Sequence, residues 1–484
     1  MNKIAIITKE KEYTYYEIKK KVDEFADQIT TRELIFILCH NSIESIVGYA
    51  ASVQNETVPL LLSSKLTDEK YMELIYTYLP RYIWCENIRD MQVMVKSSVG
   101  ECAITVEAIY QADNYVLYSL QYDNVEENEK LYHELALLLS TSGSTGNSKL
   151  VRISYNNLKS NTEAIIESIG ISSKDVTITT LPMNYTYGLS VINTHLSAGA
   201  TIVLNEDSVI SKSFWDKMKA HKVTSIAGVP YTYDMLKKLR IDKLSLSHLR
   251  MLTQAGGGMS IGTRRYLQDY CERCDKKLVV MYGQTEATAR ISYMPYEMLH
   301  KKPDNVGVAI PGGKIWIQNE QAGECVAPYV EGEIIYEGKN VSLGYAYTRA
   351  DLSKGDERNG TLHTGDYGYL DEDGYLYIKG RKDRQVKIFG NRIDLDSLEK
   401  DICEKYGSEC ICSIKNEKFI VKCTFLYDEA DLCNYVSKLL GIHKNNIEFE
   451  YIKKLYRNEI GKVNYSWSDK YTIYSNLKLT YDNI

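Results

Sequence analysis

The stretch from Leu135 to Lys149 combines a continuous apolar run with a loop rich in hydroxyl groups and glycine. The run Leu135–Leu139 predicts a strand that is buried on both faces. Beyond it, Gly143 and Gly146 let the backbone bend so that N–H groups converge, and such concavities bind anions. The remaining polar groups are five hydroxyls and one cation: Ser140, Thr141, Ser142, Ser144, Thr145 and Lys149. Together these residue types predict a loop that binds a phosphate group.

The spacing of this loop, G-x-x-G-x-x-K, differs from that of the ordinary P-loop. A P-loop needs four residues between its glycines and a hydroxyl residue directly after the lysine. The alternative is a flexible Ser/Gly loop without a ligand. Motifs further along the chain decide between the two.

Composition limits the classes of function. The chain has 484 residues, which predicts a large domain and at least one smaller one. A net charge of −6 gives no electrostatic footprint for nucleic acid. The N-terminus is charged too early for a signal peptide, and no apolar run reaches the length of a membrane span. Eleven cysteines include a single C-x-x-C, at Cys271 and Cys274, so we expect free thiols in a cytoplasmic protein.

The residues that could do chemistry follow strand-like runs. Between Leu135 and Gly283 six apolar runs alternate with helical patterns, which predicts a largely parallel sheet with helices on its faces. Two further polar or glycine-rich turns, Gln254–Gly258 and Tyr282–Glu286, follow such runs. Ligands of parallel sheets bind beyond the carboxyl ends of the strands. We therefore expect the three loops to meet at one site.

The parts of the chain before and after this region have other sequence patterns. Residues 1 to about 130 are predicted to open an α/β domain, and short glycine-punctuated strands from Asn305 predict a small antiparallel unit. The charged segment Gly380–Arg384 is typical of a linker. The last hundred residues predict strand, helix, strand, strand, helix, strand, with one apolar face on each helix (Leu395, Leu398, Ile402, Tyr406; Leu432, Val436, Leu439, Leu440). The predicted fold class is α/β: a large N-terminal domain of mostly parallel sheets with an antiparallel barrel-like unit, and a small α+β C-terminal domain.

Several further motifs occur in a fixed order. Downstream of the phosphate loop come Tyr282-Gly283-Gln284-Thr285-Glu286, Thr364-Gly365-Asp366, Gly380-Arg381-Lys382-Asp383 and Asn458-Glu459-Ile460-Gly461-Lys462-Val463. With these motifs the chain resembles the AMP-forming adenylate-forming superfamily, which comprises acyl- and aryl-CoA synthetases, stand-alone adenylation domains and luciferases. The resemblance extends from about Tyr13 to Lys462. Two departures are Ser148 in place of the usual proline and Leu150 in place of the usual glycine.

The resemblance implies a role for each motif. The phosphate loop (Thr141, Ser142, Gly143, Ser144, Thr145, Gly146 and Lys149) would handle the ATP pyrophosphate, and Gly256, Gly257 and Gly258 would line the adenine and the acyl pocket. In the next motif, which begins at Tyr282, Thr285 would meet the α-phosphate and Glu286 would hold Mg²⁺. Asp366 and Arg381 would bind the ribose, and Asp383 would be the hinge between a domain of residues 1–382 and a mobile domain of residues 383–484. Lys462 would be the catalytic lysine that bridges the substrate carboxylate and the α-phosphate.

The mechanism implied by the resemblance has two halves. A carboxylic acid attacks ATP and gives acyl-AMP and pyrophosphate, and a thiol then displaces AMP. In the family the small domain rotates about the hinge between the two halves. The thiol is CoA or the phosphopantetheine of a separate carrier protein. Only 22 residues follow Lys462, so we expect no fused carrier domain.

One segment of the chain limits the class of carboxylic acid that the enzyme could activate. Pro182–Leu189 stands where the family lines its acyl pocket, and amino-acid-activating members carry an aspartate there. No acidic residue occurs between Asp175 and Glu206, which favours a non-amino acid, because an unpaired buried ammonium is costly. Tyr185, Tyr187 and Tyr231 could line the pocket or belong to the core. CoA synthetases often carry histidine at the place of Tyr185.

Three alternatives remain open at this point. The chain could be a stand-alone amino-acid adenylation enzyme that loads a separate carrier protein. It could be a degenerate member that binds nucleotide without turnover, although Lys149, Glu286, Asp366, Arg381 and Lys462 are all present. A luciferase-like oxygenase shares the fold, and nothing in the sequence supports that activity.

Overall fold

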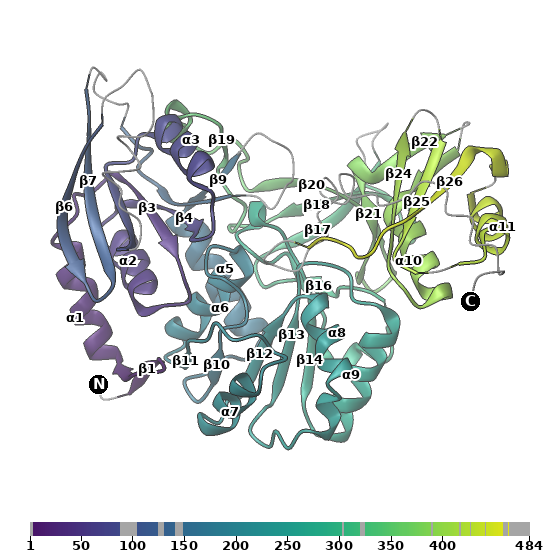
Figure 1. The fold of residues 1–484 in the computed structure, drawn as a ribbon, viewed down its shortest axis with the longest axis horizontal. Coiled ribbons are helices and arrows are strands. Elements are labelled where there is room, and N and C mark those ends of the chain that lie inside the picture. Colours follow the sequence, from purple (N-terminus) through teal and green to yellow (C-terminus); the bar gives the residue numbers. More distant parts are fainter. Residues whose placement is uncertain are drawn as a thin grey trace, which may run out of the picture.

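The structure is a computed structural model that describes residues 3–87, 104–123, 130–140, 149–302, 304–319, 325–388, 391–415, 418–425, 427–440, 442–457 and 463. For residues 383, 385–388, 391–394 and 397 it describes the backbone alone. Within these ranges the chain forms two large sheets with helices, a smaller antiparallel sheet, and a C-terminal α+β unit at one end (Figure 1). This architecture agrees with the predicted fold class.

The first large sheet has the order β19-β9-β8-β4-β3-β5-β7-β6. β3 (Leu34–Cys39) is buried at every position, and its alternate residues face two different cores. Ile35 and Ile37 belong to the cluster that includes α1 and α2, whereas Leu34 and Phe36 belong to the cluster that includes α3. The other elements here are β4 (Val58–Ser63), β5 (Tyr82–Glu86), β6 (Ile104–Ala112), β7 (Tyr115–Tyr122), β8 (Leu135–Ser140), β9 (Leu150–Ser154), β19 (Gly344–Ala346), α1 (Tyr15–Ala26), α2 (Ile43–Gln54) and α3 (Asp68–Tyr78).

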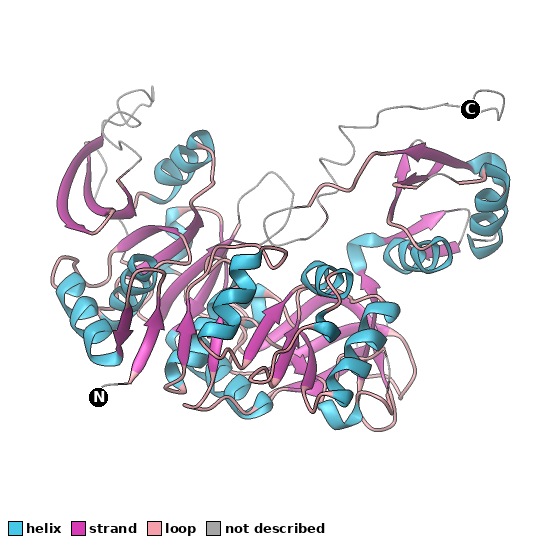
Figure 2. Cartoon of the chain, turned by 60° about the horizontal axis from the view of Figure 1, so that its bottom comes forward, coloured by secondary structure: helices cyan, strands magenta, loops and turns pink. Residues whose placement is uncertain are grey.

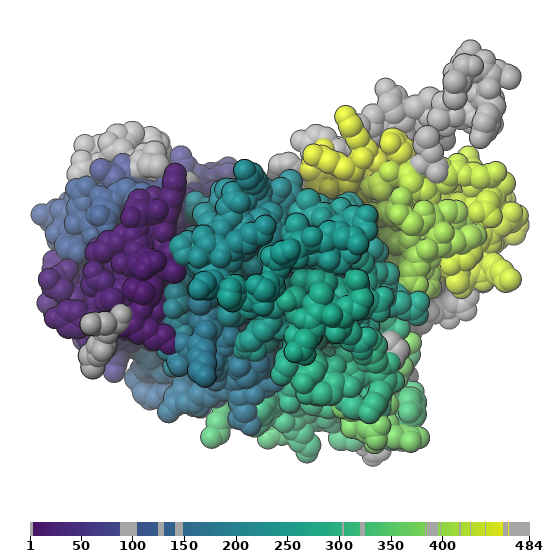
Figure 3. All heavy atoms as spheres, turned by 90° about the horizontal axis from the view of Figure 1, so that it is seen from below, coloured from purple at the N-terminus to yellow at the C-terminus, as the bar shows by residue number. Residues whose placement is uncertain are grey.

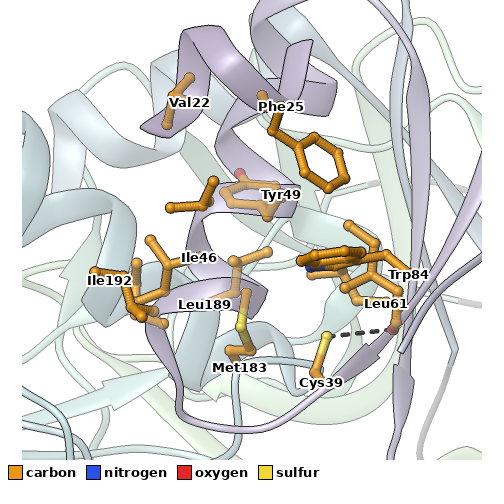
Figure 4. Packing of buried hydrophobic residues seen from close by; sticks show 14 of the residues in the cluster. Val22, Phe25, Cys39, Ile46, Tyr49, Leu61, Trp84, Met183, Leu189 and Ile192 are labelled. Carbon is orange, nitrogen blue, oxygen red and sulfur yellow. Dashed lines mark hydrogen bonds between the residues drawn. The ribbon is translucent and has the colours of Figure 1, made fainter. Parts of the chain in front are cut away.

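Ile18, Val22 and Phe25 recur at helical spacing, and α1 buries these three side chains. Thr14 begins it with a capping box, in which the side chains of Thr14 and Glu17 each bond the other's backbone N–H. α1 and α2 then pack onto the sheet around Trp84 (Figure 4). The same cluster includes Leu189 and Ile192 of α6 and Ile202 of the second sheet, so one core joins the two sheets.

The second large sheet has the order β16-β15-β14-β13-β12-β10-β11-β1-β2, and its central strands are parallel as predicted. One expectation was wrong: β8, which leads into the phosphate loop, belongs to the first sheet and not to this one. The elements are β1 (Ile4–Ile7), β2 (Glu12–Thr14), β10 (Val176–Ile178), β11 (Thr201–Val203), β12 (Ser225–Gly228), β13 (Met251–Gln254), β14 (Lys277–Tyr282), β15 (Ser292–Tyr293), β16 (Val308–Ala309), α5 (Tyr155–Ile169), α6 (Thr186–Ser197), α7 (Lys212–Ala220), α8 (Pro230–Lys238) and α9 (Ile261–Arg273).

The antiparallel unit is a sheet of β17 (Lys314–Gln318), β18 (Gly332–Glu337), β20 (Thr361–Leu370) and β21 (Leu376–Arg381), in that order. After it come β22 (Gln385–Ile388) and β23 (Asn391–Asp394), then the C-terminal unit of α10 (Leu395–Tyr406), β24 (Cys410–Lys415), β25 (Lys418–Cys423), α11 (Glu429–Leu440) and β26 (Ile447–Tyr451). This unit lies to one side of the two large sheets (Figures 2 and 3). Leu439, predicted to lie on the apolar face of α11, is instead 44% exposed. None of the helices in the described ranges has the length and apolarity that crossing a membrane requires.

Candidate active site

Tyr282, Asp366 and Arg381 come together where β14 meets the antiparallel sheet. The Tyr282 hydroxyl donates a hydrogen bond to the Asp366 carboxylate. Asp366 stands opposite Arg381 in the β20–β21 ladder, with 3.6 Å between Arg381 Nε and Asp366 Oδ1. Burial, together with the Asp366 charge, raises the pKa of Tyr282 well above its usual range, so the phenol stays a neutral donor. Residues of three motifs, the first more than eighty residues before the other two, therefore form one polar cluster.

Glu286 and Lys149 both contact Tyr345, which belongs to β19. The Tyr345 hydroxyl donates to Glu286 Oε1 over 2.7 Å. The Lys149 ammonium lies over the Tyr345 ring at 4.1 Å, and the Arg358 guanidinium lies 4.6 Å from the same ring. Glu286 itself is buried, at 9% exposure, and Thr285 beside it is half-buried. A carboxylate and two cations thus lie around one aromatic ring.

The phosphate loop itself, Thr141–Ser148, lies outside the described residues, so the predictions for Thr141, Ser142, Gly143, Ser144, Thr145 and Gly146 stay predictions. Both of its ends are described. Ser140, the last residue of β8, pairs with Leu150, the first residue of β9. Lys149, which closes the loop, and Glu286 have Tyr345 as a common neighbour, although β8 and β14 belong to different sheets.

The glycine turn after β13 passes close to the tyrosines of the predicted pocket. Gly256 has a φ of +85°, and a Cβ there would lie 2.6 Å from the Tyr185 hydroxyl oxygen, so both conformation and space require glycine. The Gln254 side-chain amide donates to the Gly257 carbonyl over 2.8 Å and holds the turn. Gly258 has open space where a Cβ would be.

The three tyrosines predicted for the substrate pocket have different surroundings. Tyr187 is buried and donates its hydroxyl hydrogen to the Thr253 carbonyl over 2.7 Å. Tyr185 lies edge-on to Tyr187, with ring centroids 6.4 Å apart, and burial raises its pKa to about 12. Tyr231 is 45% exposed on α8, where the Arg457 guanidinium lies 5.6 Å from its ring. Tyr185 and Tyr187 thus lie together, and Tyr231 lies at the surface facing the C-terminal unit.

The predicted hinge and catalytic lysine are only partly visible. Asp383 lies in the short 3₁₀ turn Lys382–Arg384, for which its backbone alone is described, and Lys462 lies outside the described residues. Val463, the next residue, forms a β-bridge with Arg457. Through Arg457 this strand-like segment reaches the Tyr231 ring of the large domain.

Two residues at the site, Arg358 and Arg290, were not predicted from the sequence. Arg358 follows no motif, and it reaches Glu286 through the fold: its Nη1 donates to the Ser342 hydroxyl and, over 3.4 Å, to the Glu286 carbonyl. Arg290 comes four residues after Glu286, and the only signal for it was a charged residue following a turn of small residues. Its side chain is buried against Tyr187.

Comparison with known proteins places this site in a family. The model of the family described as AMP-binding enzyme matches residues 1–346. The chain belongs to the AMP-binding enzyme family. It is, as the motifs predicted, an AMP-forming carboxylate–thiol ligase, which activates an acid with ATP to give acyl-AMP and pyrophosphate and then transfers the acyl group to a thiol. The resemblance to the AMP-forming adenylate-forming superfamily, which the sequence motifs indicated, is thereby confirmed.

The individual relatives share only about a quarter of their residues with this chain or fewer. A 2-succinylbenzoate–CoA ligase of Bacillus cereus is 26% identical over 418 residues, which cover 82% of this chain and 79% of the relative. The o-succinylbenzoate CoA synthetase of Bacillus subtilis, solved with its acyl-adenylate intermediate, superposes with a TM-score of 0.76 at 21% identity, covering 96% of this chain and 94% of the other. ATP-bound MatB from Rhodopseudomonas palustris gives a TM-score of 0.75 at 21% identity with the same coverage. These two structures show that the fold is shared.

Proposed function

We propose that this family member is a Mg²⁺-dependent acyl-CoA ligase for a non-amino carboxylic acid. The observation that carries the proposal is the convergence of Lys149, Glu286, Tyr282 and Asp366, from three segments of the chain, beyond the end of β14. A degenerate member would have no reason to keep this set together.

Each residue then has a role. Lys149 and the loop before it bind the ATP phosphates, and Thr285 meets the α-phosphate. Asp366 and Arg381 bind the two ribose hydroxyls, since a carboxylate accepts two donors at once. Lys462 supplies the mobile positive charge on the reacting carboxylate and phosphate, and residues 383–484 turn about Asp383 between the half-reactions. The contact of Arg457 with Tyr231 supports this, because the segment leading to Lys462 already touches the large domain beside the glycine turn.

Glu286 fits a magnesium site. Among the described residues no three acidic, histidine or cysteine side chains gather, so the protein would contribute one carboxylate and leave the other positions to phosphate oxygens and water. Mg²⁺ is commonly held in this way. The ion would neutralise phosphate charge as the acid approaches. Tyr345 orients Glu286 by its hydrogen bond and leaves the carboxylate negatively charged.

The acceptor and the acid follow from the relatives and the pocket. The Bacillus relatives are CoA ligases, and this supports CoA over a carrier protein. No acidic residue stands between Asp175 and Glu206 to pair with an ammonium, which argues against an amino acid. An enzyme that uses ATP and CoA, with buried free thiols such as Cys39, fits the cytoplasm.

The test is pyrophosphate release with ATP and Mg²⁺ across amino, fatty, aryl and dicarboxylic acids, each with and without CoA. Hydroxylamine is added in parallel to trap acyl-AMP as the hydroxamate. We expect a hydroxamate with at least one non-amino acid, and an acyl-CoA product when CoA is present. Acid-dependent turnover that CoA does not change would contradict CoA as acceptor, and turnover with amino acids alone would favour the adenylation enzyme.

A further inference from the structure

Arg290 is a buried cation without a carboxylate partner among the described residues. It is 3% exposed, and its guanidinium carbon lies 3.9 Å from the centre of the Tyr187 ring. Its hydrogen bonds are weak ones, from Nε to the Met281 sulfur at 3.4 Å and from Nη1 to the Ala289 carbonyl at 3.3 Å. Burial lowers the pKa of Arg290, and the groups that oppose this shift are Tyr187 and Tyr185 rather than an acid. A charge buried in this way is costly unless something pairs with it.

Other buried arginines in the described structure are satisfied to different degrees: Arg152 has more partners than Arg290, whereas the buried Nε of Arg264 has none. Arg152 has Glu357 as an ion-pair partner and also donates to the carbonyls of Tyr345, Lys354 and Gly355. Arg264 donates from both Nη atoms to the Asn305 carbonyl at 3.1 Å. Arg152 therefore shows that the fold can satisfy a buried guanidinium with a carboxylate and several carbonyls, and among the described residues Arg290 lacks the carboxylate.

The backbone that carries Arg290 is held in place at some cost. Thr288 and Ala289 have φ angles of +55° and +137°, which side chains other than glycine rarely adopt. Side-chain amides of Asn161 and Asn340 donate to the Arg290 carbonyl at 3.1 and 2.8 Å and fix this conformation. Strained backbone that is held by buried hydrogen bonds clusters at ligand sites.

The guanidinium lines a small cavity whose other polar groups are neutral. The cavity has a volume of about 20 Å³, room for one water molecule, and its polar lining includes Arg290, Tyr187, Ser190, Thr194, His195 and Thr253. No aspartate or glutamate is among the lining residues that the structure describes. His195 is neutral at pH 7, since burial lowers its pKa to about 4. Asp175, whose charge acts on His195, is already paired with Arg250 through contacts of 2.6 and 2.8 Å.

This cavity adjoins the predicted acyl pocket. Contacts lead from the glycine turn at Gly256 to Tyr185, from Tyr185 to Tyr187, and from Tyr187 to Arg290. An acid whose reacting end lies near Glu286 and the glycine turn would extend its far end toward the guanidinium. Because the cavity is large enough only for a water molecule, the ring of Tyr185 or Tyr187 must move to admit that end.

We propose that Arg290 binds a second anionic group on the substrate, a carboxylate remote from the one that is activated, so that the enzyme selects dicarboxylic acids. The proposal rests on the ligase function proposed above and specifies its substrate class. A planar guanidinium can hold a carboxylate through two parallel hydrogen bonds, and hydroxyls of the lining can satisfy the remaining lone pairs. A cation at this place would also repel the ammonium group of an amino acid.

The test compares acids that differ only in the distal carboxylate. Suitable pairs are succinate with butanoate, and 2-succinylbenzoate with 4-oxo-4-phenylbutanoate. We would measure kcat/KM for hydroxamate formation with the wild type and with Arg290→Met, Arg290→Lys and Arg264→Met. The acid-dependent rise in Tm without ATP would be recorded for the same four proteins. Arg264→Met is the matched control, because it removes a buried arginine away from the pocket.

We expect the wild type to prefer the diacid of at least one pair, and Arg290→Met to lower kcat/KM for that diacid about 100-fold while changing the monoacid less than about 3-fold. Arg290→Lys should fall between the two, and it carries the comparison if Arg290→Met does not fold. Arg264→Met should keep the preference. A wild type without diacid preference, or a preference that survives Arg290→Met, would overturn the proposal.

Failure of the ligase function itself would look different. If no acid gave a hydroxamate with any protein, the proposed activity would be contradicted, and Arg290 would be judged from the Tm data. A rise in Tm with the diacid that is present in the wild type and in Arg264→Met but absent in Arg290→Met would support the proposal. A rise in Tm equal for diacid and monoacid, or none with any acid, would overturn it.

Discussion

At the scale of single residues, tyrosine hydroxyls orient the two carboxylates of this site. Tyr345 donates to Glu286 and Tyr282 donates to Asp366. A phenol with a raised pKa fixes the orientation of a carboxylate without neutralising it, whereas a lysine or arginine in the same place would compete with the Mg²⁺ that Glu286 is proposed to hold. The 40 tyrosines of the chain therefore include some with a defined task at the site.

The first prediction concerns the charge of Glu286. Glu286→Gln keeps an acceptor for the Tyr345 hydroxyl and removes the negative charge, so the fold should be preserved while the magnesium site is lost. We expect pyrophosphate release at saturating acid to fall by at least about 100-fold, with Tm changed by no more than about 2 °C. Measurements are initial rates over a Mg²⁺ titration, and thermal unfolding.

Glu357→Gln is the control for this prediction. It also replaces a carboxylate by an amide, but it weakens the ion pair with the buried Arg152. Here we expect a lower Tm and an unchanged rate per folded molecule. A Glu286→Gln enzyme that keeps more than half of the wild-type rate would show that Glu286 does not hold the metal.

At the scale of elements, α2 packs on the first sheet through a glycine. A Cβ on Gly48 would lie 2.7 and 2.9 Å from Cδ1 and Nε1 of Trp84, a buried residue whose indole N–H donates to the Glu44 carbonyl. Gly48→Ala should therefore lower the free energy of unfolding by about 1–2 kcal/mol, because overpacking outweighs the gain in helix propensity. Urea unfolding followed by tryptophan fluorescence measures this.

Gly262 in α9 provides the comparison. A Cβ there would meet only the flexible Lys237 ammonium, at 3.4 Å. Gly262→Ala should be neutral or stabilise the protein by up to about 0.5 kcal/mol. If both variants changed stability by the same amount, helix propensity alone would explain the results and the close packing at Trp84 would carry no weight.

A third prediction follows from the packing of α6 on the second sheet. Burial lowers the pKa of His195 from 6.5 to about 4, and its Nδ1 lies 2.8 Å from the Val191 carbonyl. Below pH 6.5 the unfolded chain binds a proton that the folded protein refuses until about pH 4, so the free energy of unfolding falls as the pH drops through this window. The slope is at most about 1.4 kcal/mol per pH unit.

His195→Asn removes this titration and keeps an N–H donor for the Val191 carbonyl. Urea unfolding of both proteins at pH 7, 6 and 5 should show that the wild type loses about 2 kcal/mol more than the variant between pH 7 and 5. Equal losses in the two proteins would mean that His195 is free to take up a proton in the folded state.

The sequence predicted the elements whose patterns are local. Buried strands such as Leu135–Leu139 and the capped helix α1 are specified by apolar runs, periodicity and a capping box. α6 was not predicted, since its Thr, Tyr, Gly, Val and Asn residues have poor helix propensity and tertiary packing decides its structure. No local pattern predicts which sheet β8 joins or that Arg290 contacts Tyr187. Both depend on contacts between segments that are distant in the sequence.

At the scale of the whole molecule, the C-terminal unit forms its own small core. Residues of α10, α11 and the three-stranded sheet share one buried cluster, with Leu398, Val421 and Val436 among its members. Its contact with the large domain at Tyr231 is a single stacked arginine on an exposed ring. A unit with its own core suits the rotation between the two half-reactions that is proposed for it.

The last prediction separates the half-reactions through Lys462. If the small domain brings this lysine to the site for adenylation and withdraws it afterwards, Lys462→Ala should lower acid-dependent pyrophosphate release by at least about 100-fold. The same variant should keep most of its rate when it is given acyl-AMP and CoA, because the second half-reaction does not use the lysine. Lys454→Ala, which removes an exposed lysine of the same segment, should leave both rates unchanged. Equal losses in the two half-reactions would show that Lys462 acts in both, or supports the fold, and would contradict the alternation of the small domain.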